Sequence, residues 1–222
     1  MADPLLTGAL ARVVPALEKL DGERAAAVLL LCRAALDGPS RPRPGGRRPE
    51  APPVPDRWTR LSDLLHDAPG TAQGLAGQIA ETTAFGAVRP AAAVREVWEL
   101  AVPALLAAAA RRADLMTLAP LVRAGVFLQA VSSAGDVPER DDRPAPAGLT
   151  TRAAWRLAAW QRPDGGFGAP AATADCGWAL AEAAVPGLTA SQREFAVPLP
   201  DGKPPARPRT AHSPPATYGG KE

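Results

Sequence analysis

The chain has 222 residues, of which 46% are hydrophobic and only 5% aromatic, and its formal net charge is +2. This length is sufficient for one or two domains with a buried core, and so small a net charge gives no reason to expect a nucleic-acid partner. The N-terminal residues include an early aspartate and no basic region, so we expect no signal peptide.

Alanine supplies much of the apolar composition, and alanine favours helix over strand. The apolar stripes repeat at helical spacing and none alternates like a strand, so we predict an all-α array of antiparallel α-hairpins. The apolar run at residues 100–110 is too short for a transmembrane segment, which needs about 20 residues. Cys32 and Cys176 form no C-x-x-C pair, and such sparse cysteine is typical of a reducing cytoplasm, where we place the protein.

Residues 1–37 are predicted to form an N-terminal α-hairpin. Asp3 and Pro4 are suited to the N-cap and first position of a helix, and Pro15 inside this helix is expected to bend it. The apolar stripes of the two helices consist of Leu6, Leu10, Val13, Leu17 and Leu20, then Ala25, Leu29, Cys32 and Leu36.

Two proline-rich segments bound the rest of the chain. Residues 38–57 contain many prolines, glycines and arginines with little to bury, so we predict a disordered linker, with a basic partner-binding arm as the alternative. Residues 196–222 lack an apolar face and are predicted to be a disordered tail. The helical domain then occupies residues 58–195.

The first part of this domain contains several amphipathic helices. A short helix over residues 58–65 is expected to end before Pro69, and Thr71 is suited to cap the next. Asp114 or Thr117 is predicted to open the helix that precedes a polar loop. The alanine-rich residues 107–110, beside two arginines, are predicted to pack in the core, with contact to a membrane or a partner helix as the alternative.

Residues 150–186 are the most informative stretch and are predicted to form two helices joined by a sharp turn. Thr150 or Thr151 is the expected N-cap of the first helix, and Pro163 ends it. Gly165 and Gly166 permit positive φ, so the chain can reverse tightly between the helices.

Aromatic side chains are predicted to anchor this hairpin in the core. Trp160 and Phe167 are the expected anchors on the first helix and the turn, and Trp178 is expected on the buried side of the second helix. Thr173 is suited to cap the second helix, and Asp175 in its first turn would interact favourably with the helix dipole.

The turn has the sequence QRPDGGFG, residues 161–168, with a helix on each side. This hairpin resembles the repeat of the prenyltransferase and squalene-cyclase superfamily, whose α/α toroids are built of hairpins closed by a Q-x-x-D-G-G-[FW] turn. The resemblance implies that Gln161 braces the next helix and that Phe167 takes the place of the usual tryptophan. A generic helix–turn–helix with an Asp164-Gly165-Gly166 turn is the alternative.

The resemblance also implies a candidate catalytic acid. Cyclases of this family protonate a polyene with an Asp-x-Asp-Asp motif, and the nearest match here contains Asp141 and Asp142. The match departs from the pattern at its first acid, and Arg140 and Arg143 would keep the carboxylates ionised, which is the wrong state for a proton donor. A solvated charged loop is therefore the alternative that these departures favour.

A zinc site is a second implication of the resemblance, because the family's protein prenyltransferases use Asp-x-Cys and a distant histidine. Here Asp175 and Cys176 are adjacent, so their side chains diverge by about 100° on a helix. His212 lies in the predicted tail, and His66 is predicted to stabilise a helix C-terminus. Zinc needs three or four protein ligands, so we predict no metal and no cofactor.

Two functions remain open after these considerations. The first is a non-catalytic helical binding or accessory protein, an open arc of hairpins that binds a protein partner or an apolar ligand. The second is an isoprenoid enzyme, a cyclase or prenyltransferase, degenerate or truncated. The departures from the catalytic motifs favour the first, as does the scarcity of aromatic side chains that could stabilise a carbocation.

Overall fold

The computed structural model describes residues 3–38, 51–66, 68–133 and 146–193. Within these ranges the chain contains helices and no strand, which confirms the predicted all-α class. The elements in chain order are α1 (Pro4–Leu17), α2 (Glu23–Asp37), the 3-10 turn η1 (Asp56–Trp58), α3 (Leu61–His66), α4 (Ala68–Thr82), α5 (Ala92–Arg112), α6 (Leu115–Ser133), α7 (Pro146–Ala159), α8 (Pro170–Ala184) and α9 (Leu188–Arg193).

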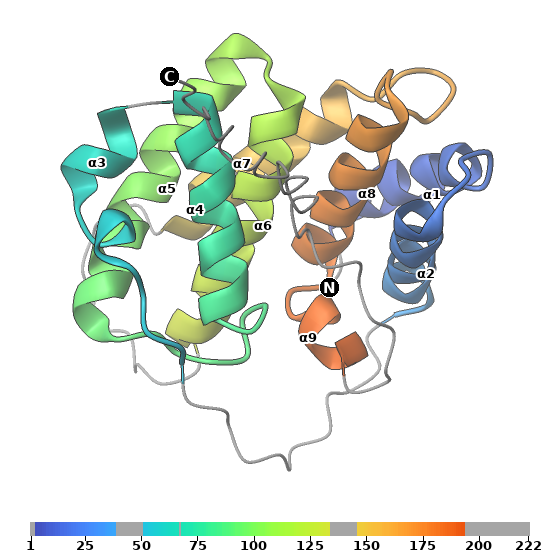
Figure 1. Cartoon of the computed structure of the whole chain (residues 1–222). Coiled ribbons are helices and arrows are strands. Elements are labelled where there is room, and N and C mark those ends of the chain that lie inside the picture. The colour runs from blue at the N-terminus through green and yellow to red at the C-terminus, as the bar shows by residue number, and fades with distance from the viewer. Residues whose placement is uncertain (1–2, 39–50, 67, 134–145, 194–222) are drawn as a thin grey trace, which may run out of the picture.

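The central element is α6, which packs against α4, α5, α7 and α8 (Figure 1). Among the described helices it is the one long and apolar enough to cross a membrane, with a mean hydropathy of 1.5 over Leu115–Ser132. Of that window, 61% is buried inside the protein. Its neighbours on several sides account for this composition, so α6 has the character of a core helix, and the described part of the chain contains no clear transmembrane segment.

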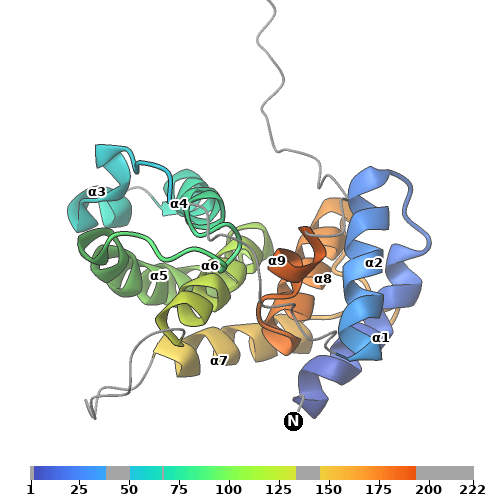
Figure 2. The same ribbon diagram turned by 90° about the horizontal axis from the view of Figure 1, so that it is seen from below.

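A second centre of packing is α8, which brings the two ends of the described chain together. Helices α1 and α2 pack along one side of α8, and α6 and α7 pack against it from the other (Figures 1 and 2). Gly177 in α8 makes this close approach possible, because a Cβ there would lie 3.4 Å from side-chain carbons of Leu17 and Val28. The N-terminal hairpin is therefore packed directly on the residue 150–186 hairpin.

Helix α1 forms as its sequence predicts. The carboxylate of Asp3 accepts hydrogen bonds from the backbone nitrogens of Leu5 and Leu6, at 2.9 and 3.4 Å, and Pro4 occupies the first turn. The predicted stripe is buried from Leu6 to Leu17, and the helix continues through Pro15 to Leu17. The last member of the stripe, Leu20, lies beyond the helix and is partly buried. In α2 Ala25 and Cys32 are buried as predicted, whereas Leu29 and Leu36 are only partly buried. Val28 and Leu31 lie in the core in their place.

Two predicted helix starts differ from the observed ones. Helix α4 begins at Ala68, so Pro69 lies in its first turn and Thr71 is an internal residue. Helix α7 begins at Pro146, so Thr150 and Thr151 lie within the helix and neither is its N-cap. In both cases a proline occupies the first turn, where it costs no backbone hydrogen bond.

Asp114 does act as the predicted cap of α6. Its carboxylate accepts a hydrogen bond from the backbone nitrogen of Thr117 at 3.1 Å. Of the predicted linker, the structure describes Gly38, which is the C-cap of α2, and residues 51–57. The latter are irregular until η1 begins at Asp56.

Several predictions concern residues outside the described ranges. These include most of the predicted linker, the polar loop at residues 134–145 and the tail from residue 194 onward. Asp141, Asp142 and His212 lie in these segments, and the side chain of His66 is also outside the description.

Candidate functional site

The turn between α7 and α8 is held by the side chain of Gln161. Its amide nitrogen donates to the carbonyl oxygens of Gly165 and Ala9, at 2.8 and 3.0 Å. Its carbonyl oxygen accepts from Nε of Arg12 at 3.0 Å. The resemblance implied a brace to the following helix, whereas these bonds go to the turn itself and to α1. Gln161 thus joins the hairpin to the first helix of the chain.

Of the two predicted turn glycines, only Gly165 has positive φ. Its φ is 83°, and a Cβ at this position would lie 1.9 Å from the carbonyl oxygen of Arg12. Gly166 is not in the positive-φ region, which corrects the sequence-based prediction, and Gly168 at φ 92° supplies the second such residue. The carboxylate of Asp164 accepts from the backbone nitrogen of Gly166 at 2.9 Å and closes the turn locally.

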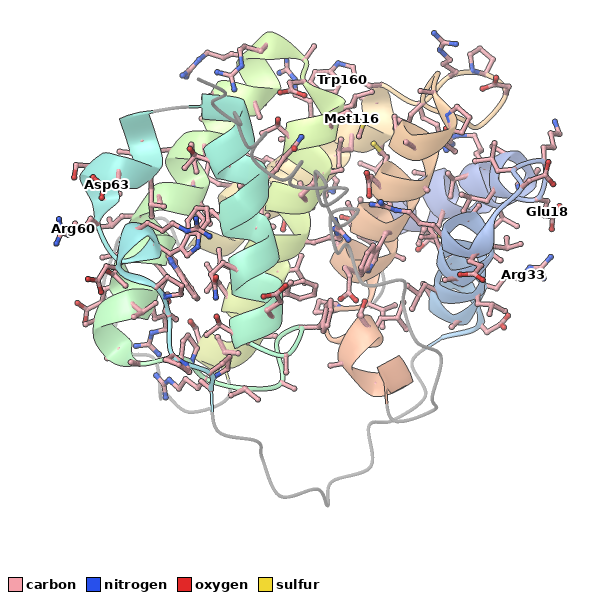
Figure 3. The ribbon with its side chains drawn as sticks, in the orientation of Figure 1. Glu18, Arg33, Arg60, Asp63, Met116 and Trp160 are labelled. Carbon is pink, nitrogen blue, oxygen red and sulfur yellow. The ribbon has the colours of Figure 1, made fainter. Side chains whose placement is uncertain are left out.

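Thr173 contacts the turn from inside α8 and does not cap the helix. The N-cap position is Ala169, and the Thr173 hydroxyl accepts from the backbone nitrogen of Phe167 and donates to the carbonyl of Ala169, both at 3.0 Å. Phe167 is buried at 5% exposure, as predicted for a core anchor. Trp160 is only half-buried at the end of α7, and the guanidinium of Arg156 lies 5.3 Å from its ring centroid (Figure 3).

A small hollow of about 170 Å³ lies beside this turn, between α1 and the start of α8. Its ionisable lining residues are Lys19 and Asp164. Asp164 is already engaged by the backbone of Gly166. No described pair of lining side chains has the arrangement of a nucleophile and a base.

Asp175 is a buried ion-pairing residue. Because α8 begins at Pro170, Asp175 lies in the second turn of the helix, beyond the range of a dipole interaction at its start. Its carboxylate forms an ion pair with Arg24 of α2 and lies 3.9 Å from Nη2 of Arg123 in α6. Asp175 therefore links three helices.

Arg123 balances this buried carboxylate. Burial lowers the pKa of its guanidinium to about 10, and the nearby Asp175 opposes that shift. The guanidinium carbon stacks 3.8 Å from the ring centroid of Trp178, and the same ring stacks on Phe85 with centroids 6.3 Å apart. Arg123 stays charged at neutral pH because its pKa remains well above 7.

Cys176 is a poor metal ligand in this environment. Burial raises the pKa of its thiol to about 12, so the thiolate that binds metals and attacks substrates is absent at neutral pH. The adjacent Asp175 carboxylate is taken by arginines. Within the described ranges, no group of three or more His, Cys, Asp or Glu side chains is arranged to hold a metal ion.

Glu182 is the buried acid that the sequence analysis did not identify. It is 0% exposed, and one carboxylate oxygen accepts from both the backbone nitrogen of Thr189, at 2.6 Å, and the Thr189 hydroxyl. That hydroxyl also accepts from the indole nitrogen of Trp178 at 2.9 Å. The second oxygen, Oε2, is buried without a hydrogen-bond partner among the described residues.

Burial raises the pKa of Glu182 to about 7, against the opposing effect of the Thr189 bonds and Arg123. Its role in the structure is to attach α9 to α8. The sequence does point to this buried acid, because Glu182 is the sole charged residue in the mainly apolar stretch of residues 176–192.

A separate surface feature lies between α5 and α7, the side of α6 opposite α4 in Figure 2. It is a cleft of about 130 Å³, which we call the α5–α7 cleft. The residues that line it are Pro103, Leu106, Ala107 and Ala110 from α5, and Leu149, Arg152, Ala153 and Arg156 from α7.

This cleft shows that the alanine-rich part of α5 is shared between the core and the surface. Ala109 is fully buried, as core packing predicts, whereas Ala107 is exposed at the cleft. Arg152 and Arg156 are exposed, and neither forms an ion pair with another described residue. Cationic side chains thus border an apolar floor.

The chain matches no family model, and it has no significant match among the curated proteins or the solved structures.

Proposed function

We propose that this protein is a non-catalytic helical protein, an arc of α-hairpins that acts by binding a partner protein. The observation that carries the proposal is the α5–α7 cleft, where an apolar floor is bordered by Arg152 and Arg156. An apolar centre with a polar rim is the usual anatomy of a protein-interaction site. We also propose a cytoplasmic location, and the two free, buried cysteines Cys32 and Cys176 support it.

The polar residues of the hairpin support the same proposal, because their hydrogen bonds hold the fold together. Gln161 and Asp164 are engaged in the turn and at α1. Asp175 is paired with arginines. Glu182 has a pKa suited to proton transfer near pH 7, but it is 0% exposed and has no access to a substrate.

An isoprenoid enzyme, degenerate or truncated, is the second candidate. The observation in its favour is the Q-x-x-D-G-G-F turn, in which Gln161 makes hydrogen bonds that link two helices. Its acid candidates, Asp141 and Asp142, lie outside the described residues.

One pair of assays separates the two candidates. The full chain and its Asp141→Asn/Asp142→Asn variant are incubated with farnesyl diphosphate and, separately, with squalene, and the products are analysed. In parallel, the tagged wild type is used to capture proteins from an extract of its native cells. A binding protein should form no product and should retain a protein in stoichiometric amount. A product that the wild type forms and the folded variant does not would overturn the proposal.

A further inference from the structure

We propose that the α5–α7 cleft is the docking site for an amphipathic helix of a partner protein, and that this helix carries acidic side chains beside its apolar face. The proposal rests on the binding function proposed above and adds the surface and the chemistry of the partner. It follows from the shape of the cleft, its apolar flanks and its uncompensated charge.

The size of the cleft fits one large apolar side chain. A cavity of about 150 Å³ lined by apolar residues accepts a benzene-sized molecule, and the α5–α7 cleft measures about 130 Å³. Leu149 on its border is 42% exposed, and Leu100, one turn before Pro103 on α5, is 63% exposed. A helix presents apolar anchors one turn apart, and the cleft together with these leucines offers matching contacts.

The charge around the cleft selects the partner's polar residues. Arg152 and Arg156 are one turn apart on α7, and Arg111 lies one turn beyond Ala107 on α5. All three arginines are exposed, and none forms an ion pair with another described residue. Among the described residues, no acidic side chain lines the cleft. Arginine pairs with carboxylates in a bidentate fork, so Glu or Asp on the docked helix complements this border.

The first test uses two labelled helical peptides with identical leucine positions. One carries glutamates on the flanks of its apolar face, and the other carries lysines at the same positions. Fluorescence anisotropy with the full chain should show binding of the acidic peptide only, weakened by salt. In Arg152→Glu/Arg156→Glu the acidic peptide should bind at least about tenfold more weakly and the lysine peptide should now bind.

Two control variants separate the cleft from the rest of the surface. Arg60, the residue before α3, is exposed and points away from the helices (Figure 3), so Arg60→Glu should leave peptide binding unchanged. Ala107→Trp should fill the cleft and abolish binding, whereas the same exchange at Ala26, an exposed residue of α2, should not. The helical circular dichroism of each variant shows that it is folded.

Other occupants of the cleft would overturn the inference, and each has its own result. Equal binding of both peptides, or no binding, would exclude the proposed charge recognition. A dimer that Arg152→Glu/Arg156→Glu dissociates would assign the cleft to a second copy. Binding to phosphatidylserine vesicles without peptide binding would assign it to a membrane. Replacing the four acidic residues within residues 136–142 by their amides tests whether this segment of the chain itself occupies the cleft. A tenfold gain in peptide affinity in that variant would assign the cleft to this segment.

The proposed function and the inference fail in different ways. If the wild type retains a native partner but binds neither peptide, the binding function stands and the docking site is wrong. If no partner is retained and neither peptide binds, both are wrong.

Discussion

The amide nitrogen of Gln161 lies 3.0 Å from the carbonyl oxygen of Ala9, so the end of α7 is hydrogen-bonded to the first helix of the chain. Nε of Arg12 donates to the carbonyl oxygen of the same Gln161 amide at 3.0 Å. One side chain thus closes the turn before α8 and fixes the N-terminal hairpin against it. The residues that resemble a family motif serve here as a joint between distant segments.

Replacement of Gln161 tests this joint. Gln161→Glu keeps an acceptor for Arg12 but loses the donor that satisfies the carbonyls of Ala9 and Gly165. We expect it to lower the free energy of unfolding by about 1–3 kcal/mol, because buried carbonyl groups lose their partner. Urea denaturation at pH 7 measures the change. A Gln161→Glu protein as stable as wild type would show that these bonds contribute nothing.

Gly165 and Gly187 provide a matched pair for the close approach of α1. Both have a φ of 83°, but a Cβ at Gly187 meets nothing within 4 Å, whereas at Gly165 it lies 1.9 Å from the carbonyl oxygen of Arg12. Gly187→Ala should cost about 1 kcal/mol from backbone strain alone. Gly165→Ala should cost clearly more in the same denaturation experiment, since α1 must move away. Equal costs would show that α1 does not contact the turn.

The hairpin's aromatic residues should differ in importance. Phe167 is 5% exposed, so Phe167→Ala should lower the free energy of unfolding by about 3–5 kcal/mol. Trp160→Ala should cost less because this ring is half-buried, and Asp164→Ala should cost about 1 kcal/mol for one local hydrogen bond. The melting temperatures of the three variants give the order. A Phe167→Ala protein that melts at the wild-type temperature would show that Phe167 does not anchor the turn in the core.

Glu182 should make stability depend on pH. Burial raises its pKa from the ordinary value of 4.5 to about 7, so the folded protein binds this proton more tightly than the unfolded chain. Its contribution is fully present below pH 4.5 and is lost as the pH rises through about 7. The loss amounts to about 3 kcal/mol at roughly 1.4 kcal/mol per pKa unit.

Glutamine substitution isolates this effect. Glu182→Gln should flatten the dependence of the unfolding free energy on pH between 4.5 and 7. The same exchange at Glu18, an exposed residue paired with Arg33 at 2.6 Å on the outer face of α1 and α2 (Figure 3), should leave the profile unchanged. A Glu182→Gln profile that follows the wild type would contradict the assignment.

Local patterns in the sequence predicted the features that depend on neighbouring residues. The stripe of α1 and the caps at Asp3 and Asp114 require only the helix that follows them. The start of α7 was predicted wrongly because proline favours the first turn of a helix and threonine favours its N-cap, so Pro146 and Thr150 are both suited to begin it. Packing decides between them: a Cβ on Gly125 of α6 would lie 2.5 Å from the Thr150 hydroxyl, so Thr150 is enclosed inside the bundle.

The candidate site could not be predicted from the sequence, because it is formed by contacts between distant segments that no local pattern reveals. The sequence predicts that Asp175 interacts with the helix dipole, whereas in the structure its carboxylate lies beside Arg24 and Arg123. The α5–α7 cleft likewise depends on contacts between segments that are distant in sequence. Its alanines and arginines come from two helices whose relative position follows from their packing on α6.

We propose that the residue 150–186 hairpin maintains the fold and that the α5–α7 cleft binds the partner. The most direct test of this division is the amount of native partner that the tagged chain retains from cell extract. Arg152→Glu/Arg156→Glu should lose that partner while keeping a melting temperature close to wild type, and Arg60→Glu should retain both. Full retention by the double variant, with its fold intact, would contradict the account.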